Sequence, residues 1–528
     1  MLLTILPINK KIHVEKGENL YNIIRNYGVD LGVCSGNRTC KKCKVLITKG
    51  NTLELSKEEL KCLWTDEIKR GIRLACCFLI TEDTTIILMN KIKPYEPKVN
   101  QYTINENYIS KEANELDLTH QTTKQYGVVI DIGTTTVEAI LWDTVLKRMI
   151  ASIKVANPQS VYGKDVISRI TFSNKSKDNQ NTLTKMIRTC CNDIIKEMVE
   201  KNNIVAISIN KVVIAANTTM TQLFCGNSVE GLGYVPIRNI NYEAREYLGF
   251  EVDMPFLGQA HIYVMPSIGG HVGSDTLACI IGCDLHEKKE KSLLVDIGTN
   301  GEIALSIDGN ILVCSTAAGP AFEGATLSYG MGAVEGAIYS VQYKRDNFTL
   351  KVIGEKHNTK ALGICGSGVV EAVYEFYANG IMDDTGRLLG EYSINNSVAL
   401  YKDKEREVLI TQKDIREIQL AKGAIYAGIM ILLKTYKIHL DEIEAIYIAG
   451  AFGSNMNIYK AMGIGLIPRL DENKVHLIGN GALQGATKIL LGDMDYEGVE
   501  KVKLRCKHID LALSEDFQEE FINALSFH

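Results

Sequence analysis

A four-residue pattern that occurs twice constrains this chain more than any other feature of its sequence. Asp131-Ile-Gly-Thr follows the apolar run 126–130, and the same four residues begin again at Asp296 after the run 291–295. In both copies an alternating, strand-like segment comes next. Two copies 165 residues apart with matching flanks predict two similarly built α/β lobes that face each other.

Each copy has the composition of a turn that binds phosphate. An acidic residue at a strand end, a glycine and then hydroxyl residues form a tight hairpin whose backbone N–H groups and hydroxyls hold phosphate. Asp131 and Asp296 would then face a magnesium ion through water. One such turn is also an ordinary hairpin, so the inference rests on the pair. The residues expected around phosphate and magnesium are Asp131, Gly133, Thr134, Thr135, Asp296, Gly298, Thr299 and Asn300.

A third segment and an acidic residue complete the predicted nucleotide site. In 445–455 an apolar strand runs into a glycine-rich turn, where Gly450 and Gly453 would let the backbone approach a nucleoside closely. Asp296 or Glu302 is expected to orient the attacking water. A carboxylate near a strand end is also easily a solvated turn residue, which is the alternative for both.

Other glycine-rich turns are expected to line the same cleft. They lie at 266–275, 314–325 and 363–368, and the second of them contributes Glu323 as a candidate polar residue. Helix N-termini with glycine are ready anion sites. For each loop alone, helix capping with close packing explains the glycines equally well.

The cysteines near the N-terminus predict an iron–sulfur cluster. Cys34, Cys40 and Cys43 lie within ten residues of one another, and Cys76 follows at the end of an apolar alternation. Plant-type ferredoxins hold a two-iron cluster with nearly this spacing, with four residues rather than five in the first gap. A structural zinc site is the alternative, but zinc ribbons usually pair two C-x2-C knuckles, and here there is one such pair. Cys76 is preferred to Cys77 because it ends the alternation.

Changes in the pattern of apolar and polar residues along the chain indicate the expected domain limits. Residues 1–92 alternate short strands with one helix, and the polar stretch 93–124 is expected to be a linker. From residue 125 onward strands and helices alternate, as is typical of α/β folds. We assign 125–293 to the first lobe and 294–528 to the second.

Composition excludes some classes of function. The net charge of −5 offers no basic surface for nucleic acid. No apolar run reaches the roughly 18 residues of a membrane span, and the first residues lack the pattern of a signal peptide. We therefore expect a cytoplasmic protein with no nucleic-acid or membrane partner, whose 14 cysteines stay reduced.

These segments resemble known families. Residues 1–92 resemble a plant-type ferredoxin domain, which implies a β-grasp fold with a [2Fe–2S] cluster on the four cysteines. The two acidic turns and segment 445–455, in this order, resemble the phosphate-1, phosphate-2 and adenosine motifs of the actin-like ATPases. That resemblance implies a two-lobed, ribonuclease H-like ATPase with ATP and Mg²⁺ in the cleft.

The fusion of the two modules resembles the reductive activators of corrinoid enzymes. Segments 157–170, 217–226, 315–325 and 414–425 look like recurring segments of that family. The resemblance implies ATP-dependent transfer of an electron from the [2Fe–2S] cluster to Co(II) of a corrinoid protein, which regenerates Co(I) for methyl transfer. It also implies an upstream low-potential electron donor, and it leaves a homodimer as an open option.

Three alternatives remain at this point. A small-molecule kinase of the actin-like superfamily with a redox-sensing ferredoxin module would need a substrate pocket and a base for a hydroxyl. Activators of 2-hydroxyacyl-CoA dehydratases resemble the chain in their ATPase motifs, but they hold a [4Fe–4S] cluster between subunits and have no ferredoxin domain. A non-catalytic scaffold is disfavoured by the two intact acidic turns.

Overall fold

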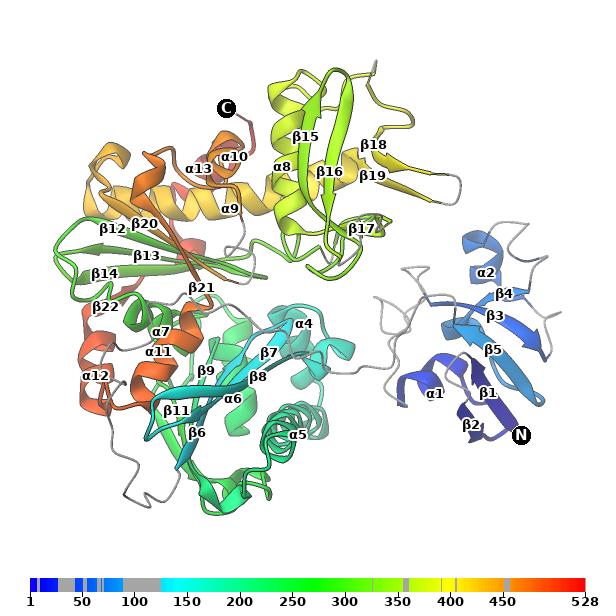
Figure 1. The fold of residues 1–528 in the computed structure, drawn as a ribbon, viewed down its shortest axis with the longest axis horizontal. Helices are drawn as coiled ribbons and strands as arrows, with labels where there is room; N and C mark the ends of the chain where they lie inside the picture. Colours follow the sequence, from blue (N-terminus) through cyan, green and yellow to red (C-terminus); the bar gives the residue numbers. More distant parts are fainter. Residues whose placement is uncertain are drawn as a thin grey trace. The chain divides into compact units, whose positions relative to one another are not determined.

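The structure is a computed structural model, and it forms two compact units (Figure 1). One unit is Met1–Lys98 with Pro158–Lys164, and the other is Val99–Asn157 with Asp165–His528. The residues that the structure describes are 1–6, 10–26, 43–50, 55–63, 68, 71–88, 125–324, 326–354, 360–390, 392–403, 406–450 and 456–527. Three residues of the predicted sites lie outside this set: Cys34, Cys40 and Gly453.

The N-terminal unit contains a five-stranded mixed sheet. Its strands run in the order β2-β1-β5-β3-β4, with β1 parallel to β5 and antiparallel to β2. The elements are β1 (Leu2–Leu6), β2 (Lys10–His13), α1 (Leu20–Asn26), β3 (Lys44–Lys49), α2 (Lys57–Cys62), β4 (Ile72–Leu74) and β5 (Thr84–Leu88). Alternate residues of the strands enter one core, since Leu3, Ile5 and Val45 are fully buried. This is the expected ferredoxin-type arrangement.

Helix α2 is an addition to the single helix that the sequence analysis expects in this unit. The Ser56 hydroxyl accepts a hydrogen bond from the Glu59 N–H, and the Glu59 carboxylate accepts one from the Ser56 N–H, both at 3.1 Å. This capping box satisfies two of the backbone donors that a helix start leaves open. The Ser-x-x-Glu pattern that signals it is present in the sequence.

The first lobe of the larger unit is a six-stranded sheet in the order β10-β11-β9-β6-β7-β8. Strands β6, β7 and β8 form an antiparallel meander, and β9 and β11 continue parallel to β6. The strands are β6 (Tyr126–Ile132), β7 (Thr136–Asp143), β8 (Arg148–Ala156), β9 (Ile209–Ala216), β10 (Arg245–Leu248) and β11 (His261–Val264). The helices are α4 (Val166–Ser173), α5 (Lys177–Lys201), α6 (Thr218–Cys225) and α7 (Ser274–Gly282).

The second lobe repeats this topology. Its sheet has the order β21-β20-β12-β13-β14-β22, with an antiparallel meander of β12, β13 and β14 and with β20 and β21 parallel to β12. The strands are β12 (Ser292–Ile297), β13 (Gly301–Ile307), β14 (Asn310–Thr316), β20 (Ala445–Ala449), β21 (Val475–Gly479) and β22 (Cys506–His508). The prediction of two similarly built lobes, made from the repeated turn, is confirmed.

Between β14 and β20 the second lobe carries an insertion and its main core helix. The elements are β15 (Ala337–Lys344), β16 (Asn347–Val352), β17 (Gly363–Ile364), α8 (Gly366–Ala378), β18 (Ser397–Lys402), β19 (Glu407–Thr411) and α9 (Gln412–Tyr436). Among the described residues, α9 is the one helix long and apolar enough to cross a membrane, yet 72% of its most apolar stretch is buried inside the protein. That burial is typical of a core helix, and α9 covers the sheet in Figure 1.

The C-terminal helices return part of the chain to the first lobe. They are α10 (Ile458–Gly463), α11 (Gly481–Leu490), α12 (Tyr496–Arg505) and α13 (Phe517–Asn523). Helices α7 and α11 lie between the two sheets in Figure 1. They cross so closely that a Cβ on Gly485 would lie 1.9 Å from the Ala278 carbonyl oxygen. The two lobes therefore share a core, in which Val129 of β6, Leu294 of β12 and Ile489 of α11 are all buried.

Candidate functional site

The two acidic turns meet where the two lobes come together. Thr135 follows β6 and Thr299 follows β12, and their Oγ1 atoms lie 2.7 Å apart. Both hydroxyls also contact Glu323: Thr135 donates at 2.7 Å and Thr299 lies 3.1 Å from each carboxylate oxygen. Thr135 and Thr299, 164 residues apart in the chain, thus bring hydroxyl groups of both predicted turns to one point.

Acidic side chains gather behind these hydroxyls. Burial, with the carboxylates of Asp275 and Glu138 nearby, raises the pKa of Asp131 to about 7. Burial also raises the pKa of Asp275 to about 7, and burial with the Asp131 charge raises that of Asp296 to about 6. Carboxylates that crowd one another in this way resist full ionisation unless a cation joins them. The donor set therefore fits a hard divalent cation.

No three carboxylate, histidine or cysteine groups converge on a single metal position within the described part of the chain. The magnesium site on Asp131 and Asp296 stays a prediction. Mg²⁺ keeps several waters and takes one or two carboxylates plus substrate phosphates, so the two aspartates would hold such an ion through water.

Asn480 holds the first acidic residue in place, and the sequence analysis did not identify it. Its Nδ2 donates to Asp131 Oδ2 at 3.0 Å and to Glu138 Oε2 at 3.3 Å. Its Oδ1 caps α11 by accepting from the Leu483 N–H at 3.0 Å. The signal in the sequence is an asparagine just before a helical segment, but that pattern says nothing about a partner 349 residues away.

A buried arginine supports the first turn from behind. Arg169 of α4 is fully buried, and its guanidinium donates to the Thr134 carbonyl oxygen and lies 3.2 Å from Met220 Sδ. Asn217 donates to the Thr134 hydroxyl at 2.9 Å, and Asn157 donates to the Gly133 carbonyl at 2.8 Å. Thr134 is thus bonded within its own lobe, which leaves Thr135 as the hydroxyl that faces the second turn.

The glycines of the turns differ in how strictly they are required. A Cβ on Gly133 would lie 2.9 Å from the Thr136 carbonyl oxygen, whereas at Gly298 the nearest atom would be 3.6 Å away. Gly450 has φ +97°, and a Cβ there would lie 2.5 Å from the Ile297 carbonyl oxygen. Gly450 therefore packs against the second acidic turn, and its predicted contact with a nucleoside stays a prediction.

Glu302 lies on β13, beside the second turn. It is buried, and Ser315 Oγ lies 3.4 Å from its carboxylate. Burial and the charges of Asp275 and Asp296 raise the pKa of Glu302 well above its usual range. Asn300 is its other side-chain partner. The role expected of Glu302, to orient the attacking water, stays a prediction.

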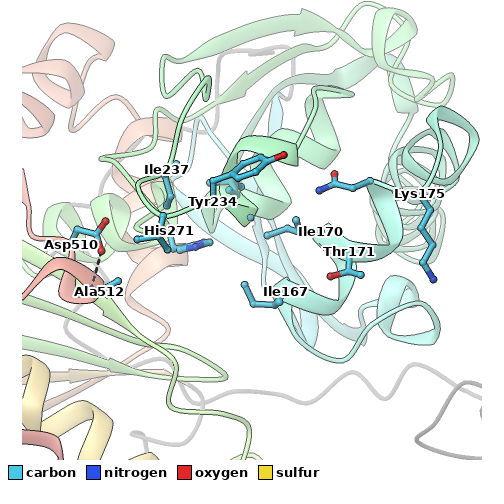
Figure 2. Close-up of a pocket in the computed structure, with 13 residues that line it drawn as sticks. Ile167, Ile170, Thr171, Lys175, Tyr234, Ile237, His271, Asp510 and Ala512 are labelled. Atoms are coloured by element: carbon cyan, nitrogen blue, oxygen red, sulfur yellow. Dashed lines mark hydrogen bonds between the residues drawn. The ribbon is translucent and has the colours of Figure 1, made fainter. Parts of the chain in front are cut away.

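A pocket of about 480 Å³ opens beside α4 (Figure 2). Figure 2 shows Ile167, Ile170 and Thr171 of α4 facing it, with Tyr234 on another wall. None of the residues predicted to bind phosphate or magnesium lines this pocket. It is therefore separate from the acidic cleft, although Arg169 on the same helix reaches the first turn.

Two of the four predicted cluster ligands fall within the described residues, and they lie together. Cys43 Sγ, just before β3, is 3.2 Å from Cys76 Sγ, and both side chains are buried. That separation is too long for a disulfide bond. It is short enough for both sulfurs to bind one metal ion with a small adjustment. Cys77 Sγ lies 3.9 Å from Cys76 and is more exposed, which favours the choice of Cys76.

A buried ion pair fixes the strand that leads to Cys76. Arg73 of β4 donates to both carboxylate oxygens of Glu59, each at 2.8 Å, and both side chains are almost completely buried. Glu59 also accepts from the Leu74 N–H at 3.0 Å. Bidentate pairs of this kind specify geometry as well as adding energy. Helix α2 therefore holds the backbone two residues before the cysteine.

Together these features define an iron–sulfur ATPase: a ferredoxin-type domain joined in one chain to a two-lobed, actin-like nucleotide cleft. Three family models match the chain. They are a 2Fe-2S iron–sulfur cluster binding domain (residues 3–81), the RACo middle region (126–288) and the C-terminal ASKHA domain of RACo (290–528).

Named relatives agree with these matches. The corrinoid activation enzyme RamQ of Eubacterium limosum is 33% identical over 416 residues, which cover 75% of this chain and 69% of that protein. A reductase of the Co(II) methylated amine-specific corrinoid protein from Methanosarcina barkeri is 27% identical, with 76% of this chain and 77% of that protein covered. A solved reductive activator for a corrinoid, iron–sulfur protein matches 100% of this chain and 98% of its own, at 25% identity and a TM-score of 0.70. The chain belongs to this family of corrinoid-protein activators.

Proposed function

We propose that this chain is an ATP-dependent reductive activator of a corrinoid protein. It returns the inactive Co(II) form of the corrinoid substrate to Co(I), the form that accepts a methyl group. The observation that carries the proposal is the presence, in one chain of this family, of a buried cysteine pair in a ferredoxin-type domain and a cleft where two acidic turns meet.

ATP is required because the reduction is uphill. A plant-type [2Fe–2S] cluster supplies single electrons at about −400 mV. For one electron each ~59 mV is a factor of ten, so a gap of ~240 mV to the Co(II) corrinoid needs a factor of about 10⁴. That factor is roughly 5.5 kcal/mol, the size of a full two-state population shift. ATP can supply this free energy only if the nucleotide-bound states of the protein differ in their affinity for the corrinoid protein.

The residues at the two turns have different roles in binding ATP and magnesium. Asp131 and Asp296 hold Mg²⁺ through water, and their ionisation is favoured once the cation is present. Thr135 and Thr299, one from each lobe, donate to the phosphate oxygens. Because the two hydroxyls belong to different lobes and lie 2.7 Å apart, a phosphate bound by both would link the lobes, and its hydrolysis would break that link.

The ferredoxin-type domain holds the electron carrier. Cys43 and Cys76 provide two thiolates, and Cys34 and Cys40 complete a set of four that suits a [2Fe–2S] cluster. An upstream low-potential donor reloads the domain after each turnover. The cytoplasm is the compartment we expect, since all these thiolates must stay reduced or bound to iron.

Formation of Co(I) tests the proposal directly. The protein, purified without oxygen, is mixed with a Co(II) corrinoid protein, a reductant-fed donor, ATP and magnesium, and the Co(I) absorbance band is followed over time. Growth of the band with ATP and its absence without ATP supports the proposal. A flat trace with several corrinoid proteins, despite an intact two-iron spectrum and measurable ATPase activity, would instead favour a redox-coupled kinase and a screen of phosphate acceptors.

A further inference from the structure

Glu323 is the one acidic side chain of the described cleft that contacts both turns through their hydroxyls. Its loop is tightly fixed, because the neighbouring Phe322 is buried and Gly324, with φ +76°, packs against the Met331 backbone. A Cβ at Gly324 would lie 2.7 Å from the Met331 nitrogen. The backbone that carries Glu323 is thus held by the packing of its two neighbours.

Two other acidic residues near the second turn, Asp296 and Glu302, have different surroundings. Asp296 is contacted by Cys279 Sγ at 3.4 Å and stands beside Asp131, where a cation belongs. Glu302 is buried on β13 and bonded to Ser315. Glu323 is only half-buried, so part of its side chain reaches solvent while its carboxylate contacts the two hydroxyls.

We propose that Glu323 is the catalytic base of ATP hydrolysis, the role that the sequence analysis gave to Asp296 or Glu302. The inference rests on the ATPase activity in the proposed function. The Thr135 and Thr299 hydroxyls, which contact Glu323, are those expected to bind the terminal phosphate of ATP. A water that attacks this phosphate would therefore lie within hydrogen-bond reach of the Glu323 carboxylate. As the new P–O bond forms, the water proton passes to Glu323 and the P–O bond to ADP breaks. Glu323 then releases the proton through its solvent side.

The test compares three single variants with the wild type: Glu323→Gln, Glu302→Gln and Glu335→Gln. Glu335 is an exposed glutamate of the same lobe, two residues before β15, and serves as the matched control. Steady-state ATPase activity, ATP-analogue binding and thermal unfolding are measured for each. A positioned general base contributes about 10²- to 10⁴-fold, so Glu323→Gln should lose that much kcat while its affinity for the analogue stays within a few-fold.

The split between turnover and binding separates a base from a residue that only braces the turns. Loss of a base should lower kcat with little change in affinity for the analogue, whereas loss of a brace should weaken analogue binding as well. Loss of analogue binding in Glu323→Gln, or an unchanged kcat, would overturn the assignment while the wild type still hydrolyses ATP. A wild type with no ATPase activity, with or without a corrinoid protein, would overturn the proposed function itself.

Discussion

The two acidic turns carry the same four residues on strands of equivalent sheets, but they are supported in different ways. The first is held by polar groups, with Arg169 on its backbone and Asn480 on Asp131. The second is held by close packing, with Gly450 pressed against Ile297. The repeat therefore specifies the shape of the site, while its surroundings specify how firmly each half is fixed and which half carries the acid–base chemistry.

The largest expected effect is loss of either aspartate. Asp131→Asn and Asp296→Asn should each lower ATPase activity by about 10²-fold or more, because both carboxylates are needed to stabilise a cation that polarises the phosphate. Magnesium-dependent ATP binding and turnover are the measurements. Asp493→Asn, which removes an exposed ion pair with Lys147, is the control. If one of the two cleft variants kept wild-type turnover, the turns would not act as one site.

The next effect distinguishes polar from packed support. Arg169→Met leaves the buried Thr134 carbonyl without its guanidinium donor, and we expect the free energy of unfolding to fall by about 1–3 kcal/mol, with weaker ATP binding. Arg188→Met is the matched control, because Arg188 also donates to a carbonyl, that of Phe224, but does not contact the turn. Denaturant unfolding measures the stability of both variants, and nucleotide titration measures their affinity for ATP. Only Arg169→Met should weaken ATP binding, and an equal loss of ATP affinity in both variants would contradict the account.

Gly450→Ala tests the packed side. A Cβ would meet the Ile297 oxygen at 2.5 Å and Asp296 Oδ1 at 2.9 Å, so the second turn must shift, and we expect about 1–3 kcal/mol of strain and weaker ATP binding. Gly492→Ala has a similar backbone cost, with φ +81°, but its Cβ would meet nothing within 4 Å. The difference between the two variants in ATP affinity isolates the collision. No difference would mean that the turn adapts freely.

The smallest effect is a dependence of stability on pH. The pKa values of Asp131 and Asp296 are raised to about 7 and about 6, so the folded protein holds protons that the unfolded chain releases near pH 4. Without magnesium the free energy of unfolding should therefore fall as the pH rises from 5 to 7.5, by up to about 1.4 kcal/mol per pH unit for each proton. Urea unfolding at several pH values measures it. Asp131→Asn and Asp296→Asn should each reduce the slope, and Asp275, whose pKa is also about 7, should keep part of it in both variants. A flat wild-type profile would contradict the burial of these acids.

The sequence predicts local features of this molecule better than distant ones. The turns at Asp131 and Asp296 can be predicted because a strand, an acidic residue and a glycine follow one another in the sequence. The preference for Cys76 rests on the alternation of apolar residues in the strand before it. Arg169 and Asn480 are not readable as site residues, because each reaches its turn from an element distant in the chain. The return of α11 to the first lobe is invisible for the same reason. Its small residues permit a close helix crossing but do not name the partner.

The central claim is that ATP, bound by both turns, drives an electron to the corrinoid protein through a difference in affinity. The most direct measurement is the affinity of the protein for a Co(II) corrinoid protein in the presence of ATP and in the presence of ADP, with the Co(I) form measured in parallel. The account predicts that the preference for one cobalt state over the other changes with the nucleotide, by a factor approaching about 10⁴ over the cycle. Equal affinities in all four combinations would contradict it, since a nucleotide that does not discriminate between states cannot drive the reduction.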